Sequence, residues 1–155
     1  MDRFMRKAVT LALENVQSGG QPFGAVLVKD GEVLSEGVNE LHKKFDVSGH
    51  AEMLAIRRAQ EAGSTLDLSG CVMYASGEPC PMCMAAIYFS GIQKVYYCAS
   101  VEDAKAVGLG TSGNIYKELA LPKEERSIKI EQMPLEEGME NPMEVFSDHS
   151  DELGK

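Results

Sequence analysis

The sequence predicts an α/β protein in which helices cover both faces of one sheet, a three-layer α/β/α sandwich. Two observations carry this prediction: segments with apolar residues at helical spacing, and short apolar runs typical of strands that alternate with them. The chain has 155 residues, which is enough for one domain with a substantial core. We therefore expect residues 1–155 to form a single domain without an internal linker or repeat.

The expected elements alternate along the chain. Residues 2–17 carry one apolar stripe that ends at Ser18-Gly19-Gly20, which predicts a helix. Two strands are expected over 23–28 and 33–38, joined at Asp30-Gly31, a dipeptide typical of hairpin turns. The later patterns predict a loop over 39–49, a helix over 50–62, a strand over 71–75, a helix over 80–90 and a strand over 94–99.

The last third of the chain carries shorter patterns. We expect a short helix over 101–106 and a loop over 108–113, where small and polar residues gather. Isoleucines alternate with charged residues at 128–131, which predicts a fifth strand. A final helix is expected over 141–146, before an acidic end.

Composition and charge narrow the class of protein. Hydrophobic residues make up 44% and charged residues 25%, which is typical of a globular chain. No apolar run approaches the roughly 20 residues that span a bilayer, and the N-terminus lacks the apolar segment of a secretion signal. These features predict a cytoplasmic protein without a membrane partner. The net charge of -9 argues against a nucleic-acid partner, because affinity for DNA or RNA comes largely from cationic side chains.

Four cysteines lie at positions 71, 80, 83 and 98. Without a secretion signal, thiols or metal ligands are expected rather than disulfides. Cys71 and Cys98 fall in strand-like apolar runs, and we expect both to be small side chains of the core. Cys80 and Cys83 lie three residues apart at the start of a predicted helix, so both sulfurs can face one point.

His50 and Glu52 lie at the start of the other central helix. His50 and two thiolates at a helix N-terminus make three ligands for Zn²⁺ and leave a fourth position to water, as in catalytic zinc sites. Zinc lowers the pKa of that water toward neutrality. Glu52 lies two residues from a ligand, where it can carry a proton from water to a leaving amino group. The sequence thus predicts a zinc cofactor, with Glu52 as the catalytic residue.

Two interpretations from other classes remain open at this point. Cys80 and Cys83 could form a redox pair, although redox pairs usually follow the first strand of the fold. The zinc could also be purely structural in a binding module without chemistry. A structural site prefers a fourth protein ligand, and Glu52 beside an open position would then have no purpose.

Nearly the whole chain resembles the cytidine deaminase superfamily, and within it most closely the bacterial guanine deaminases. The metal and proton-transfer motifs match the H-x-E and P-C-x-x-C signature of zinc-dependent nucleobase deaminases. The residues that carry the resemblance are Pro22-Phe23-Gly24-Ala25-Val26-Leu27-Val28-Lys29-Asp30-Gly31, Asn39, His50-Ala51-Glu52, Glu78-Pro79-Cys80-Pro81-Met82-Cys83, Ala86-Ile87-Tyr88, Ile115-Tyr116-Lys117-Glu118 and Lys123-Glu124-Glu125-Arg126.

The resemblance implies a central mixed five-stranded sheet, a homodimer and hydrolytic deamination of a nucleobase, first of all guanine to xanthine plus ammonia. It implies that Asn39 hydrogen-bonds the substrate ring, that the Ala51 backbone lines the pocket and that Phe23 packs near the base. It also implies that residues 141–155 form a tail that closes the active site of the partner subunit, with Phe146 as the apolar lid residue.

One segment departs from the guanine deaminases. These usually carry an acidic stretch before the Ile-Tyr-Lys-Glu segment, and one aspartate there reads the purine. This chain has Leu109-Gly110-Thr111-Ser112-Gly113-Asn114 instead, which lacks a carboxylate. Deamination of cytosine or another small amino-substituted ring or nucleoside is therefore an alternative. A tRNA adenosine deaminase shares both motifs but fits the acidic net charge less well.

Overall fold

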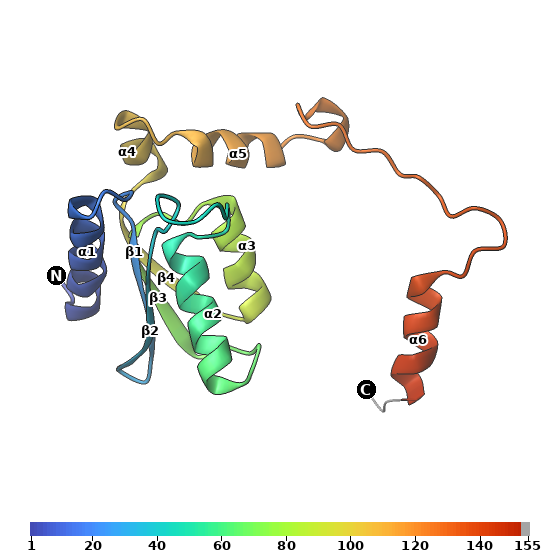
Figure 1. The fold of residues 1–155 in the computed structure, drawn as a ribbon, viewed down its shortest axis with the longest axis horizontal. Helices are drawn as coiled ribbons and strands as arrows, with labels where there is room; N and C mark the ends of the chain where they lie inside the picture. The colour runs from blue at the N-terminus through green and yellow to red at the C-terminus, as the bar shows by residue number, and fades with distance from the viewer. Residues whose placement is uncertain (153–155) are drawn as a thin grey trace. The chain divides into compact units, whose positions relative to one another are not determined.

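The computed structural model describes residues 1–152 and divides the chain into two units, Met1–Ala120 and a second that begins at Leu121 (Figure 1). The first unit contains one sheet in the order β2-β1-β3-β4. β1 pairs antiparallel with β2 and β3, whereas β3 and β4 are parallel, so the sheet is mixed. The strands are β1 (Gly24–Lys29), β2 (Glu32–Val38), β3 (Cys71–Gly77) and β4 (Lys94–Ala99).

Helices cover both faces of this sheet, as the sequence predicts. α1 (Arg3–Gln17) lies on one face, and α2 (Ala51–Gly63) and α3 (Pro81–Ser90) lie on the other (Figure 1). The alternation of side chains along β1 builds both cores. Val26 and Val28 pack with α1, while Ala25 and Leu27 join the core under α2 and α3.

The predicted hairpin is confirmed at Asp30-Gly31. Both residues have positive φ, 50° and 77°, as a two-residue type I′ turn requires. Gly37, near the end of β2, is needed for a different reason. A Cβ at this position would lie 2.2 Å from the Ala51 carbonyl oxygen, so the absence of a side chain allows the first turn of α2 to approach the strand.

The expected fifth strand is wrong for the described residues, in which the sheet has four strands. Residues 128–131 form no strand, and Ile128 and Ile130 are exposed. An alternating pattern becomes a strand only where a neighbouring edge pairs with it and one face is buried. Neither condition is met at 128–131.

Cys98 also differs from the expectation. Cys71 is buried in the core, but Cys98 is exposed on β4. β4 is an edge strand, and most of its side chains, that of Cys98 among them, are exposed. The apolar run at 94–99 is therefore a strand, as predicted, and Val95 rather than Cys98 packs against the core.

The segment after β4 contains one helix more than expected. α4 (Val101–Ala106) begins at a capping box formed by Ser100 and Asp103. The loop predicted over 108–113 ends early, because α5 (Thr111–Leu119) begins inside it. Glycine and polar residues at its first turn suggest a loop locally. Tertiary contacts hold the helix, among them a 2.6 Å hydrogen bond from the Tyr116 hydroxyl to the Pro79 carbonyl.

The second unit contains a short 3₁₀ turn, η1 (Lys123–Glu125), and α6 (Pro142–Glu152). The helix predicted over 141–146 is thus present and longer than expected. Residues 153–155 of the predicted tail lie outside the described residues. Within the described part of the chain, no helix is long and apolar enough to cross a membrane.

Candidate active site

The predicted metal ligands come from the starts of two neighbouring helices. His50 is the residue that immediately precedes α2, and Cys80 has the same place before α3. The Cys80 sulfur accepts a hydrogen bond from the Cys83 backbone N–H at 3.5 Å, so it caps the helix. Cys83 lies in the first turn and is fully buried. Local helix-start geometry therefore directs both sulfurs to one side.

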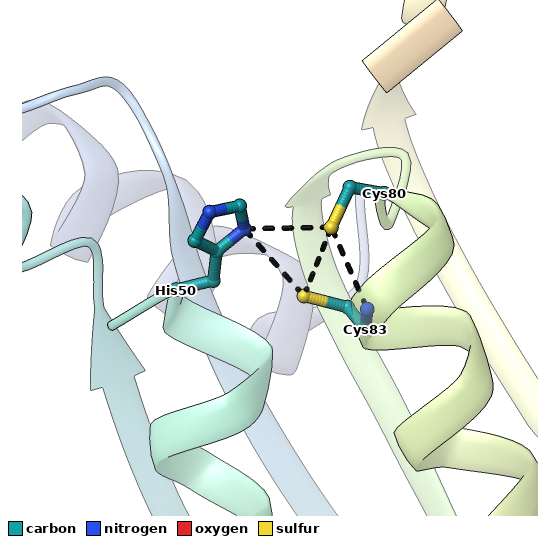
Figure 2. Close-up of side chains that lie close together, drawn as sticks. All are labelled: His50, Cys80 and Cys83. Atoms are coloured by element: carbon teal, nitrogen blue, oxygen red, sulfur yellow. Dashed lines mark hydrogen bonds between the residues drawn. The ribbon is translucent and has the colours of Figure 1, made fainter. Parts of the chain in front are cut away.

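Figure 2 shows the His50 ring pointing at the two sulfurs. Its Nδ1 atom lies 3.5 Å from the Cys80 sulfur and 3.6 Å from the Cys83 sulfur, and the sulfurs are 3.5 Å apart. A tetrahedral zinc ion, about 2.3 Å from sulfur and 2.0–2.1 Å from nitrogen, holds such atoms about 3.5–3.8 Å apart. The three side chains therefore fit zinc without rearrangement.

Both cysteines are free thiols, and their proton affinities differ. Hydrogen bonding with Cys83, followed in importance by that with His50, lowers the pKa of Cys80 to about 4. The same contact, together with burial, raises the pKa of Cys83. One thiolate is thus available at neutral pH before a metal arrives. The His50 ring shares the site with both sulfurs, which favours a metal centre over a simple thiol redox pair.

Glu52 lies in the first turn of α2 and is buried. Burial raises the pKa of its carboxyl to about 7, and the Cys80 thiolate acts in the same direction. A carboxyl that titrates near neutrality is suited to accept and return a proton. Gly37 contributes indirectly, because it permits the turn of α2 that carries Glu52 to pack against β2.

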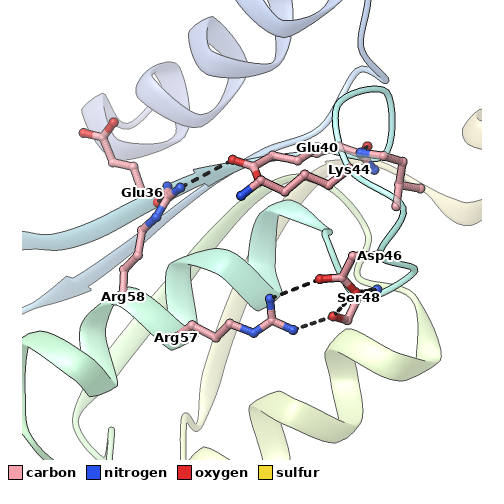
Figure 3. Close-up of polar contacts among 9 residues, drawn as sticks. Glu36, Glu40, Lys44, Asp46, Ser48, Arg57 and Arg58 are labelled. Carbon is pink, nitrogen blue, oxygen red and sulfur yellow. Dashed lines mark hydrogen bonds and ion pairs between the residues drawn. The ribbon is translucent and has the colours of Figure 1, made fainter.

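A polar network fixes the loop that leads into His50 (Figure 3). Asp46 accepts hydrogen bonds from the Ser48 backbone and hydroxyl at 2.9 and 2.6 Å. Arg57 of α2 donates to the Ser48 hydroxyl and forms a 3.8 Å ion pair with Asp46. The His50 N–H donates to the Ser48 carbonyl at 2.8 Å. The loop and the helix that presents the ligand are thus tied together on both sides of His50.

His50, Glu52 and Cys80 line a cavity of about 640 Å³ in the first unit. This volume suits a small molecule rather than a polymer. Its walls come from the segment before β1, the loop after β2, the end of β3, the starts of α2 and α3, and the segment from α4 to α5. The predicted site residues that line it are Phe23, Asn39, His50, Glu52 and Cys80.

Asn39 is 1% exposed and is held on several sides. Its side-chain oxygen accepts from the Leu41 N–H at 3.0 Å, and its amide donates to the Gln21 side chain at 3.3 Å. Asn15 of α1 donates to the Asn39 carbonyl at 2.9 Å and to the Gln21 carbonyl at 2.8 Å. α1 therefore fixes the cavity wall that carries Asn39 and Gln21.

The other predicted substrate contacts lie in different places. Phe23 lines the cavity, and Gly77 makes room for its ring, because a Cβ there would come within 2.7 Å of it. Ala51 is fully buried and is not one of the cavity-lining residues among those described. Phe146 lies in α6 of the second unit, where it is 59% exposed.

Some lining residues were not anticipated from the sequence. Gln21 and Ser112 both face the cavity from segments whose composition suggests loops. The signal for Ser112 is its place in the 109–114 segment, where this chain departs from the guanine deaminases. For Gln21 no signal exists, because its contact with Asn39 is made across 18 residues of chain.

Comparisons with known proteins agree with this geometry. Residues 1–99 match the cytidine and deoxycytidylate deaminase zinc-binding region. The chain is 45% identical over 137 residues to the guanine deaminase of Bacillus subtilis (strain 168), with 88% of this chain and 87% of that protein covered. It is 38% identical over 143 residues to a tRNA-specific adenosine deaminase of Aquifex aeolicus (strain VF5), covering 92% and 91%.

The fold agrees as well. The X-ray structure of the Bacillus subtilis guanine deaminase matches with a TM-score of 0.83 and 40% identity over 100% of this chain and 96% of that one. The matched family region includes both helix starts that carry His50, Glu52, Cys80 and Cys83. The chain therefore belongs to the cytidine and deoxycytidylate deaminase family, and it is a zinc-binding deaminase with a His-Cys-Cys metal site.

Proposed function

We propose that the chain hydrolyses the exocyclic amino group of a free nucleobase, with guanine as the first candidate, to give xanthine and ammonia. The similarity to a guanine deaminase over most of both chains supports this substrate. The observation that carries the choice of a free base is the chemistry of the cavity. Among the described residues that line it there is no lysine or arginine. A phosphate would find no lysine or arginine to pair with there.

The proposed chemistry consumes one water and releases one ammonia. Zinc held by His50, Cys80 and Cys83 would supply a water that ionises near neutral pH. The Glu52 carboxylate accepts the proton of the attacking water and delivers it to the amino nitrogen, which leaves as ammonia while the ring gains an oxygen. Asn39 and Phe23 hold the ring, one by hydrogen bonding and the other by packing.

A tRNA adenosine deaminase is the second candidate, because such a protein is also similar over most of its length. The net charge of -9 and the lack of lysine and arginine among the described lining residues favour the free base.

An ammonia-release screen of zinc-loaded protein tests the substrate. Guanine, guanosine and guanosine monophosphate form a matched series, and cytosine, isocytosine, adenine, their nucleosides and a tRNA with a wobble adenosine run beside it. We expect the highest kcat/KM with guanine and at least about a tenfold loss with the monophosphate, because a buried phosphate would lack a lysine or arginine counter-ion. Preference for the monophosphate or turnover of the tRNA alone would contradict the proposal.

The fold also bears on the proposed dimer. α3 is apolar on nearly every side, and Tyr88 and Phe89 on it are 79% and 92% exposed. Tyr97 of β4, which pairs with Ala75 on the sheet face covered by α2 and α3, is exposed too. A helix that is hydrophobic all round is normally buried. We propose that a second copy of the chain covers this face, and that residues 1–155 act as one functional domain whose 141–155 tail closes the partner's site.

Deletion of residues 144–155 tests the role of the tail. The deletion should leave the protein a dimer in light scattering, because the proposed interface lies in the first unit. It should lower kcat/KM about tenfold or more, since burial of an aromatic side chain over the base contributes about 1.5–3 kcal/mol. Phe146→Ala in the full chain should give most of this loss. Unchanged kinetics in both variants would remove the tail from the active site.

A further inference from the structure

Ser112 has an unusual side chain in the cavity wall. Its Oγ atom is buried and has no hydrogen-bond partner, the single such side-chain atom in the part of the chain that the structure describes. Ser112 lies in the first turn of α5 and is a cavity-lining residue together with Asn39 and Glu52. Ser112 thus forms part of the wall of the same cavity as the catalytic carboxyl, with its Oγ atom buried within that wall.

An unpaired buried hydroxyl lowers the stability of a folded protein by about 1–3 kcal/mol. Protein interiors seldom retain such groups without a reason. A serine side chain changes between staggered rotamers by rotation about one bond, which can turn the hydroxyl of Ser112 into the cavity. A ligand that supplies the missing hydrogen bond would remove the penalty.

The surroundings of Ser112 indicate which kind of ligand group fits. Gly110 precedes α5 and has no side chain to cap it. The N–H groups of the first turn consequently lack a side-chain acceptor, and this end of the helix carries partial positive charge. Ser112 adds a hydroxyl that can donate. This wall therefore favours a hydrogen-bond acceptor.

The acceptor should be neutral. The described cavity lining contains the carboxyls of Glu52 and Glu78 and lacks lysine and arginine. An anionic ligand group at this wall would meet like charge without a lysine or arginine beside it. A carbonyl oxygen or an unprotonated ring nitrogen meets no such obstacle.

We propose that Ser112 is a specificity-determining residue whose hydroxyl donates to a carbonyl oxygen or unprotonated ring nitrogen of the substrate. This rests on the proposed function and narrows it to amino-substituted heteroaromatic rings with a neutral acceptor on the edge that faces α5. The polarity is opposite to that of a carboxylate, which accepts from a ring N–H.

A substrate–variant cycle tests the assignment. The ring with the highest kcat/KM in the ammonia screen is compared with analogues in which one ring nitrogen is C–H; for guanine these are the 3-, 7- and 9-deaza compounds. Analogues in which a ring carbonyl oxygen is replaced by hydrogen are included. We expect one analogue to lose about 5- to 50-fold in kcat/KM with wild type. With Ser112→Ala that loss should largely disappear, because the partner is gone.

Two further variants test the direction of the proposed hydrogen bond and the effect of a substitution elsewhere on α5. Ser112→Asp should lower kcat/KM for the parent ring, because a carboxylate repels an acceptor. Asn114→Ala, at an exposed position of the same helix, should keep the wild-type analogue profile. The melting temperature of ligand-free Ser112→Ala should be equal to or above that of wild type, since an unpaired hydroxyl is removed. This separates loss of recognition from loss of folding.

Other outcomes would overturn the proposal. If Ser112→Ala keeps both the wild-type kcat/KM and the same analogue losses, the hydroxyl does not read the ring. If Ser112→Asp improves turnover of the parent ring, the wall reads a donor instead. If zinc-loaded wild type deaminates no ring, the proposed function fails on its own. Binding of the same rings to Glu52→Gln, followed by thermal shift, then still reports whether Ser112→Ala weakens recognition.

Discussion

Glu52→Gln should retain zinc and the native fold but lose about 10²- to 10⁴-fold in kcat, the range that a positioned proton-transfer group contributes. Glutamine has nearly the same shape, so the packing under the first turn of α2 is preserved. It cannot accept a proton from water, and no other described carboxyl is as buried in the cavity. Steady-state ammonia release and zinc content by atomic absorption measure the two properties on one preparation.

Glu61→Gln provides the matched control, because Glu61 lies on the exposed side of the same helix. It should leave kcat within twofold of wild type, as expected of an exposed position. A Glu52→Gln protein with zinc and near-normal turnover would show that another group transfers the proton.

Comparison of wild type with Glu52→Gln also reports how much stability is lost by burying the Glu52 carboxyl. Burial raises the pKa of Glu52 to about 7, above the ordinary 4.5, so the folded state keeps its proton longer than the unfolded chain. In protein treated with a chelator, the free energy of unfolding of wild type should equal that of Glu52→Gln below pH 4.5. As the pH rises to 7, it should fall below that of the variant by up to about 3 kcal/mol. Urea unfolding at several pH values measures this difference.

The metal site could be predicted from the sequence because its geometry is local. His50 and Cys80 each precede a helix, and the two cysteines lie within one turn. Helix periodicity and cap position determine such arrangements, and both are visible in the sequence. Only the meeting of the two helix starts requires the fold, in which α2 and α3 lie on the same face of the sheet (Figure 1).

The features that the sequence did not reveal depend on distant contacts. Cys98 lies in a good strand pattern, but exposure at a sheet edge is a property of the topology. The run at 128–131 has a strand pattern and no partner. Ser112 belongs to a helix whose first turn has the composition of a loop, and its unpaired hydroxyl is defined only by what surrounds it. Pattern alone cannot supply these contacts.

Cys83→Ala should remove the metal and, with it, both activity and much of the stability. Cys83 is fully buried, and its sulfur lies within 3.6 Å of the other two ligand atoms. With two protein ligands instead of three, zinc should fall from about one per chain to a small fraction after dialysis against a weak chelator. A ligand present at about 1,000 times its Kd stabilises the native state by about 4 kcal/mol, so its loss should lower the melting temperature by several degrees.

Cys98→Ala removes an exposed thiol of the same chain and should keep zinc, turnover and melting temperature, because its sulfur is no ligand. If Cys83→Ala instead binds one zinc per chain as tightly as wild type, the pair of sulfurs is not the metal site, and the deaminase chemistry proposed for the cavity loses its nucleophile.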